Sequence, residues 1–405
     1  MTSSVYIAKN VYGGDGLGRL GDGRVVFVPG AWAGEQVRAE IVDQKSHFAR
    51  ARLVDVIEPS PERIVPGLSV PGMVYSGLSY RAECEAKEGQ LADFFSRARI
   101  PVPEIVRSRP PADPLAYRNK VVYHFAKKGG RWVIGYRQEP GHDIVDIEDD
   151  PLAVREINAK LREIRRGVTA LLMTGPEAVR RDVERSGNVT VRWSRKSGVK
   201  WWVGEPPAGL VLRETVCGLD FEVPAGGFFQ VNPAVGEQLV GAVCDAYAAR
   251  ADESPSIADL YCGVGVFGLA CLRRAAEAGV AASLAGVESG RQAVEFAKRN
   301  AVSQKVENAR FFVGRVGQSM RRVPIDRRTT VVVDPPRGGL ERGVARAIVA
   351  SGALRVFYVS CDPATLTRDL RELARAYDVE SVRWFDMFPR TARFETFVAL
   401  RRRGA

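Results

Sequence analysis

The spacing of apolar and polar residues changes twice along the chain and divides it into three parts. In residues 1–58, short runs of alternating apolar and polar positions are separated by glycine-rich turns, the pattern of half-buried strands. These runs are Val5–Ala8, Arg24–Val28, Glu35–Asp43 and Phe48–Ile57. About five short strands in so short a segment predict a small OB-like β-barrel.

A proline-rich segment follows the predicted barrel and marks a boundary. It contains Pro59, Pro61, Pro66 and Pro71. Beyond it, Glu83–Ala98 has helical periodicity. From Tyr117 to about Cys217 the pattern is mostly that of strands, interrupted by one helix near Val154–Leu172. We therefore predict an α+β central domain over residues 59–225.

From residue 226 onward strands and helices alternate, which is typical of a doubly wound sheet. Asn232 suits an N-cap and Pro233 a first helical position, so a helix is predicted from there to about Arg250. Ile257–Tyr261 is the next predicted strand, followed by a helix at Phe267–Ala278. The predicted fold class is α/β, with a Rossmann-like domain over residues 226–405.

Composition narrows the classes of partner. The 405 residues contain 59 Lys and Arg against 48 Asp and Glu, a formal charge of +11. This surplus favours a polyanionic partner such as nucleic acid, although solubility alone also accounts for it. No apolar run approaches the roughly 20 residues that cross a bilayer, and the N-terminus lacks a signal-peptide layout. We expect a cytoplasmic monomer without a membrane partner.

Basic residues lie close to aromatic residues in three segments. The first contains Lys45, His47, Phe48, Arg50 and Arg52. The second contains Arg118, Lys120, Lys127, Lys128 and Arg131 around Tyr117, Tyr123 and Phe125, and the third is Arg192–Trp202. Such mixtures suit the backbone and bases of RNA, but strands with solvated charges have the same pattern. The sequence does not separate the two interpretations.

Glycines at a predicted strand-to-helix junction indicate a nucleotide-type cofactor site. Asp259–Gly268 reads D-x3-G-x-G-x-x-G, and Gly263 and Gly265 allow a tight turn and close ligand approach. The next strand ends on Glu288, 20 residues after Gly268, where a carboxylate can accept ribose hydroxyls. Dinucleotide enzymes share these features. The mid-chain position and a later Asp-Pro-Pro favour S-adenosylmethionine over NAD.

Two further predicted strands end on reactive side chains. Thr329–Val333 leads to Asp334, and Arg355–Ser360 leads to Cys361. Because ligands collect outside the carboxyl ends of such strands, both side chains should face one crevice. The helix start that follows Cys361 tends to lower the thiol pKa, although Asp362 opposes this. Taken alone, a cysteine at the end of a buried strand more often serves packing.

The combination of Asp334 and Cys361 with Glu395 indicates methylation of uracil at carbon 5. Carbon 5 of uracil attacks a methyl sulfonium only after a thiolate has added to carbon 6. A base must then remove the carbon 5 proton, and Glu395, predicted in the loop before the last strand, is the candidate. An aromatic residue after Asp334-Pro335-Pro336 would favour methylation of amino groups, but Arg337 stands there.

At this point the chain resembles the S-adenosylmethionine-dependent RNA uridine-C5 methyltransferases. The matching segments are Phe228–Pro233, Asp259–Ala270, Gly286–Glu288, Asp334–Leu340, Tyr358–Leu370 and Met387–Val398. The barrel is similar to a TRAM domain, the RNA-binding module of the ribosomal-RNA members. By resemblance, Cys361 is the nucleophile and Glu395 the base. The residues implied to contact the cofactor or the target uridine are Gln230, Tyr261, Glu288 and Asp334.

The resemblance implies 5-methyluridine as the product. It favours 23S ribosomal RNA as the substrate, because transfer-RNA members usually lack the barrel; transfer RNA stays the alternative. Many relatives hold an iron–sulfur cluster through four cysteines, but here Gly77–Tyr80 and only Cys84 occupy that neighbourhood, so we predict no cluster and no metal site. Arg393 replaces a usual histidine, and Arg315 an acidic or amide residue. These two departures leave open an RNA-binding protein or chaperone with little catalysis.

Overall fold

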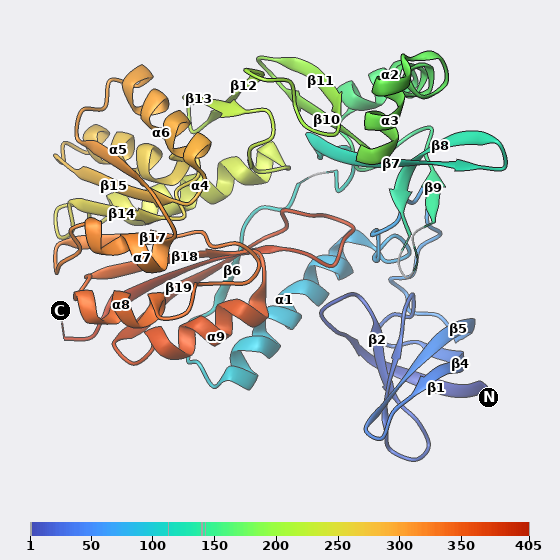
Figure 1. The fold of residues 1–405 in the computed structure, drawn as a ribbon. Coiled ribbons are helices and arrows are strands. Elements are labelled where there is room, and N and C mark those ends of the chain that lie inside the picture. The colour runs from blue at the N-terminus through green and yellow to red at the C-terminus, as the bar shows by residue number, and fades with distance from the viewer. Residues whose placement is uncertain (1, 112, 139–140, 142, 405) are drawn as a thin grey trace.

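The computed structural model describes residues 2–111, 113–138, 141 and 143–404, so His142, one of three histidines scattered along the sequence, lies outside the described residues. The chain forms a small barrel, a central domain and a large α/β domain, as predicted (Figure 1). Helix α1 (Tyr80–Ala98) lies between the barrel and the large sheet (Figure 1). Within the described ranges, no helix is long and apolar enough to cross a membrane.

The barrel closes in the order β1-β2-β3-β5-β4. Its strands are β1 (Thr2–Asn10), β2 (Gly16–Arg19), β3 (Val25–Val28), β4 (Gln36–Gln44) and β5 (Phe48–Glu58). Strand β2 was not among the predicted runs, because its glycines read as part of a turn. They are needed where strands approach closely: a Cβ at Gly18 would lie 2.5 Å from the carbonyl oxygen of Tyr6.

The central sheet has the order β11-β10-β7-β8-β9 and carries two helices. Its elements are β7 (Lys120–Lys128), β8 (Arg131–Arg137), β9 (Ile144–Asp146), α2 (Arg155–Thr174), α3 (Glu177–Ser186), β10 (Asn188–Ser194) and β11 (Gly198–Val203). A separate hairpin, β12 (Val211–Val216) and β13 (Leu219–Pro224), follows.

Several side chains that could have contacted RNA according to the sequence pattern are buried in the structure. Tyr117, Tyr123 and Phe125 lie in the core beneath α2, where apolar rings are removed from water. Arg192 is also buried and pairs with Glu214 at 3.4 Å. These four side chains are therefore not exposed for contact with RNA, which was one of the two interpretations that the sequence left open.

The large sheet has eight strands in the order β16-β15-β14-β17-β18-β20-β19-β6. They are β6 (Ile105–Arg107), β14 (Ser256–Leu260), β15 (Ser283–Glu288), β16 (Ala309–Val313), β17 (Thr329–Val333), β18 (Arg355–Ser360), β19 (Tyr377–Phe385) and β20 (Glu395–Arg402). Strands β14 to β18 are parallel, whereas β20 is antiparallel to both its neighbours. The order reverses at β14, which creates the switch point where such sheets bind ligands.

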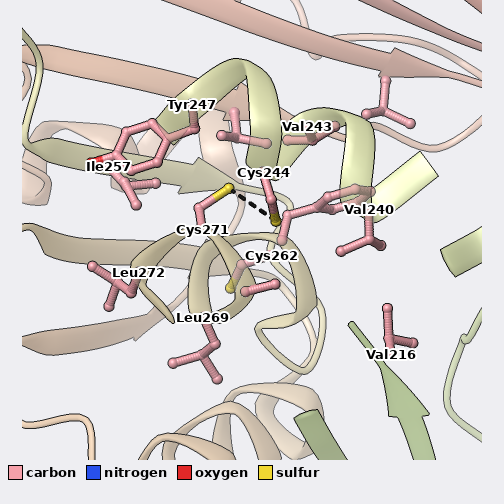
Figure 2. Close-up of a cluster of buried hydrophobic side chains, with 14 of the residues drawn as sticks. Val216, Val240, Val243, Cys244, Tyr247, Ile257, Cys262, Leu269, Cys271 and Leu272 are labelled. Atoms are coloured by element: carbon pink, nitrogen blue, oxygen red, sulfur yellow. Dashed lines mark hydrogen bonds between the residues drawn. The ribbon is translucent and has the colours of Figure 1, made fainter. Parts of the chain in front are cut away.

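Helices cover both faces of this sheet. They are α4 (Pro233–Ala248), α5 (Val266–Glu277), α6 (Arg291–Ser303), the short α7 (Val316–Ser319) with a 3-10 turn (Met320–Arg322), α8 (Val344–Ser351) and α9 (Pro363–Leu373). Helices α4, α5 and α6 pack on one face, and α1, α8 and α9 on the other. In the α4–α5 interface, Cys244 and Cys271 are buried with their sulfurs 3.7 Å apart (Figure 2).

Helix α1 and strand β6 belong to this packing, although their residues fall inside the predicted central domain. Strand β6 pairs in parallel with β19 at the edge of the large sheet. Leu91 and Phe95 of α1 join the core that α9 also covers. The domain boundary at residue 225 stays a prediction.

A buried ion-pair network connects α1 to the loop 386–394 between β19 and β20. The ammonium of Lys87 donates to Glu83 Oε1 at 2.8 Å, to Asp386 Oδ1 at 2.7 Å and to the Phe388 carbonyl at 3.2 Å. All three charged side chains are inaccessible to solvent. Burial by itself lowers the pKa of Lys87, but the nearby carboxylates of Asp386 and Glu83 raise it by a larger amount. The net pKa lies above the ordinary value, so the ammonium stays charged. The backbone N–H of Arg390 also donates to Glu83, at 2.6 Å.

Removing the buried ammonium should destabilise the protein. In Lys87→Met, Glu83 and Asp386 stay buried without a cation, which typically costs about 3–5 kcal/mol. Urea unfolding at pH 7 measures this change. The matched variant Lys160→Met breaks the exposed pair with Glu163 and should leave the unfolding free energy unchanged. A Lys87→Met protein as stable as wild type would contradict the role of the network.

Candidate active site

The predicted reactive side chains lie at one edge of the large sheet. Asp334 follows β17 and Cys361 follows β18 directly. Because β20 runs antiparallel to β18, its first residues lie at the same edge: Thr396 is opposite Ser360. Glu395 is the first residue of β20, paired with Phe385 of β19, and not part of the preceding loop as predicted.

Glu395 is a buried acid without a full set of partners. It is 5% exposed, and its Oε2 has no hydrogen-bond partner among the described residues. Burial raises its pKa well above the usual value, the negative charge of Asp334 raises it further, and Arg337 lowers it. A buried carboxyl group with a free oxygen is available to accept or donate a proton.

Burial is also the main influence on the pKa of the Cys361 thiol. The pKa of Cys361 is raised to about 12, mainly by burial and then by Glu395, Asp334 and Asp362, while Arg337 lowers it. Asp362 caps α9 by accepting from the backbone N–H groups of residues 364 and 365, both at 3.1 Å. The sequence suggested that the helix start lowers the thiol pKa. Here desolvation and the surrounding carboxyl groups outweigh that effect.

The carboxyl groups along this edge form an acidic cluster. Burial raises the pKa of Asp334 to about 7, and Asp259 adds to the increase. Asp259 is buried, its pKa is likewise raised to about 7, and its Oδ1 has no hydrogen-bond partner in the described parts of the chain. A buried and a half-buried acid with raised pKa values fit a positively charged ligand, such as the sulfonium of S-adenosylmethionine.

The glycine loop after β14 has the predicted form of a nucleotide site. Gly263 and Gly265 have φ values of 53° and 89°, which glycine adopts without strain, and Gly265 is the N-cap of α5. The backbone N–H of Gly263 donates to Glu288 Oε2 at 3.3 Å, and that of Gly290 donates to Glu288 Oε1 at 2.7 Å. Glu288 thus lies at the end of β15 beside the loop, as expected.

Tyr261 and Gln230 are placed by different elements. Tyr261 follows β14 with a φ of 70°, and its hydroxyl accepts from the backbone N–H of Glu341 at 3.1 Å. This contact ties the glycine loop to the segment after Asp334. Gln230 is half-buried before α4, where a Cβ on Gly236 would approach its side chain at 3.1 Å. Nearby, the Asn232 amide donates to the carbonyl of residue 387 at 3.4 Å.

Two residues near the site were not among the predicted ones. Arg337 is exposed and lowers the pKa of both Cys361 and Glu395. Its position directly after Asp-Pro-Pro was the signal for it, because that loop follows a strand that ends at the site. Tyr12, in the barrel, contacts Asp362 across 350 positions of sequence. No local pattern indicates a contact of that separation.

The structure shows what surrounds Arg393 and Arg315, the two residues that depart from the family pattern, and it bears on the missing cluster cysteines. Arg393 donates to the Tyr12 hydroxyl at 2.7 Å and lies 3.5 Å from Asp362 Oδ2. Arg315 forms an exposed pair with Glu341 at 3.3 Å. Across the described residues, no group of three or more His, Cys, Asp or Glu side chains is arranged to hold a metal ion. The absence of an iron–sulfur cluster stays a prediction.

Comparison with known proteins identifies the relatives of this chain. The family model described as tRNA (Uracil-5-)-methyltransferase matches residues 216–403, and the TRAM domain model matches residues 5–54. Uncharacterized RNA methyltransferases of Thermosynechococcus vestitus and Clostridium acetobutylicum are both 30% identical. The matches cover 96% of this chain in each case, and 95% and 94% of the two relatives.

A solved structure shares the whole architecture. The Pyrococcus abyssi tRNA (uracil-54, C5)-methyltransferase in complex with S-adenosyl-L-homocysteine superposes with a TM-score of 0.73. The match covers 98% of this chain and 100% of that protein, at 23% identity. This similarity shows the fold.

The raised thiol pKa has a direct consequence for reactivity. Only the thiolate reacts with iodoacetamide, so alkylation of Cys361 should still accelerate above pH 10 in the folded protein. In urea the same cysteine should level off above its ordinary pKa of about 8.5. Mass spectrometry of the peptide that contains Cys361 separates it from the other five cysteines. A plateau near pH 8 in the folded protein would contradict the raised pKa.

Proposed function

The chain belongs to the S-adenosylmethionine-dependent RNA uracil-5 methyltransferases, and from this premise we propose that Cys361 and Glu395 carry the reaction. The observation that supports the proposal is their common position at the edge of β18 and β20. A thiol and a buried acid with a free oxygen are the two groups that methylation of carbon 5 requires.

The chain supplies the steps on the uridine. The target base leaves its stack to reach the site. The Cys361 thiolate adds to carbon 6 and makes carbon 5 nucleophilic, and carbon 5 takes the methyl group. Glu395 then accepts the carbon 5 proton, and the bond between sulfur and carbon 6 breaks to release the thiolate and restore the ring. S-adenosylmethionine supplies the methyl group when bound.

The residues proposed to hold the cofactor are those at the ends of β14, β15 and β17, together with Gln230 before α4. The strand-end residues are Tyr261, Gly263, Gly265, Glu288 and Asp334. A cation in this acidic cluster lowers the pKa of each carboxyl group, because opposite charge favours the ionised form. Glu395 then has the ionised form that a general base requires. Glu395 would therefore be ionised before the methyl transfer and could accept the carbon 5 proton afterwards.

Loss of each catalytic group should stop the reaction at a different stage. Cys361→Ala should lower the rate of 5-methyluridine formation by at least about 1,000-fold, because carbon 5 is no longer activated. Glu395→Gln should still form the bond to carbon 6 but retain it, so that a covalent protein–RNA complex accumulates on denaturing gels. Nucleoside mass spectrometry quantifies the product.

Matched variants control for nonspecific effects. Cys217→Ala replaces a half-buried cysteine near Glu237, and Glu307→Gln replaces an exposed glutamate. Both should methylate RNA at the wild-type rate. Full activity in Cys361→Ala would remove this residue from the mechanism. Absence of the covalent complex with normal turnover in Glu395→Gln would assign the proton to another base.

RNA contacts are proposed on exposed basic side chains of two domains. On the barrel these are Lys45, His47, Arg50 and Arg52, and on the central domain they are Lys127, Lys128 and Arg131. The guanidinium of Arg50 lies 5.7 Å from the ring of Phe27, a combination of charge and aromatic face that suits nucleic acid. Arg52 pairs with Glu40 at the surface, so RNA has to compete for it.

We propose ribosomal RNA, of the 23S type, as the substrate, because the family resemblance associates such a barrel more often with the ribosomal-RNA members than with the transfer-RNA members. Transfer RNA is the second candidate for a specific reason. The matching family is described as tRNA (Uracil-5-)-methyltransferase, and the archaeal tRNA enzyme overlaps 98% of this chain. The barrel therefore does not by itself distinguish the two substrates.

The substrate class can be read from methylation of separated RNAs. Undermodified ribosomal and transfer RNA are incubated in parallel with S-adenosylmethionine and the enzyme, with Cys361→Ala as the background. New 5-methyluridine should appear in the ribosomal fraction, approaching one or a few sites per molecule. Product confined to transfer RNA would reverse the assignment and leave the reaction unchanged.

A further inference from the structure

A loop of the barrel reaches the candidate active site. Tyr12 lies between β1 and β2, and its hydroxyl accepts from Arg393 Nη1 at 2.7 Å. The same hydroxyl is 3.4 Å from Asp362 Oδ2, and Arg393 is 3.5 Å from that oxygen. Three side chains from three distant parts of the sequence thus share one polar cluster.

The Tyr12 ring also packs into the α/β domain. It meets Phe94 of α1 and Phe394 edge-on, with ring centroids 5.6 and 5.8 Å apart. The guanidinium of Arg393 lies over the ring at 5.4 Å from its centroid. Tyr12 is partly buried and packs against the hydrophobic core of the large sheet, not against that of the barrel. Its packing therefore belongs to the neighbouring domain.

These contacts involve the chain neighbours of both reactive groups. Asp362 follows Cys361 and fixes the start of α9 through the backbone N–H groups of Ala364 and Thr365. Phe394 precedes Glu395. A displacement of Tyr12 would therefore shift the residues next to Cys361 and Glu395, although Tyr12 hydrogen-bonds to neither of these two.

The barrel loop is shaped for this approach. Gly14 has a φ of 97°, and a Cβ there would lie 2.7 Å from the Val74 side chain. The Asn10 amide donates to the carbonyls of Ala31 at 3.0 Å and Gly14 at 3.4 Å, which fixes the loop to the barrel. Gln90 of α1 donates to the Asn10 carbonyl at 3.3 Å. The loop is anchored on both sides of Tyr12.

We propose that Tyr12 is a positioning residue for the methyl transfer, and that the barrel is therefore part of the catalytic centre as well as an RNA-binding module. This inference rests on the proposed roles of Cys361 and Glu395. Tyr12 holds the Arg393 guanidinium beside Asp362, where it offsets the negative charge next to the thiol. A barrel that only tethers RNA would need no such contact.

The test is Tyr12→Phe, which removes the hydroxyl and keeps the ring. The value of kcat should fall about tenfold or more, as expected for displaced reacting groups, while KM for RNA and for S-adenosylmethionine stays within about twofold. Tyr6→Phe is the matched control, because Tyr6 is a barrel tyrosine that is 59% exposed. It should retain the wild-type kcat.

A second readout needs no RNA. At pH 10, alkylation of Cys361 by iodoacetamide should slow by about two- to tenfold in Tyr12→Phe, the range that one hydrogen bond contributes. Arg393→Gln should slow it in the same direction, because Asp362 then loses its cation. The groups acting on this thiol are Asp334, Arg337, Asp362 and Glu395, and both variants retain all four. Thermal unfolding verifies that each variant is folded.

The two readouts separate the possible failures. Wild-type kcat and alkylation rate in folded Tyr12→Phe would overturn the inference, as would a change in KM for RNA alone. If the wild-type protein methylates no RNA, the proposed function fails. The alkylation rates then still decide whether the barrel tyrosine influences Cys361.

Discussion

The buried ammonium of Lys87 is the contact on which the arrangement of the active site depends. It neutralises Glu83 within α1 and Asp386 at the start of the loop 386–394. Without it two carboxylates would face each other in a region that excludes water, a costly arrangement. The loop leads directly into Glu395, so the position of the proposed base follows from an ion pair formed by a helix outside the 226–405 segment.

The same loop collects contacts from all parts of the chain. Tyr75 donates its backbone N–H to the Arg390 carbonyl at 3.2 Å, and the Tyr117 hydroxyl donates to the Pro389 carbonyl at 3.0 Å. Tyr12 of the barrel binds Arg393. One short segment beside Glu395 therefore depends for its position on contacts from the barrel, the segment after it and the central domain.

The sequence was most informative where chemistry and strand pattern coincide. The ends of β14, β15, β17 and β18 were predicted from short apolar runs, and the glycine loop from its spacing, because both depend on neighbouring residues. Packing partners distant in sequence were not predictable. The sequence did not show that Tyr117, Tyr123 and Phe125 are buried. Alternation of apolar and polar residues does not say which face of a sheet is covered, and α2 packs on the face that carries these three side chains. Strand β6 was missed as part of the large sheet because only β19 gives it a partner.

The thiol pKa shows how burial reverses a local rule. A helix start after Cys361 lowers the pKa, but this effect is about 0.3–1 kcal/mol at exposed positions. Each unit of pKa corresponds to about 1.4 kcal/mol, so loss of water and three nearby carboxyl groups outweigh it. A resting enzyme with a protonated thiol is protected from oxidation. For Cys361 in its proposed role as nucleophile, a cationic cofactor lowers the thiol pKa, because opposite charge favours the thiolate.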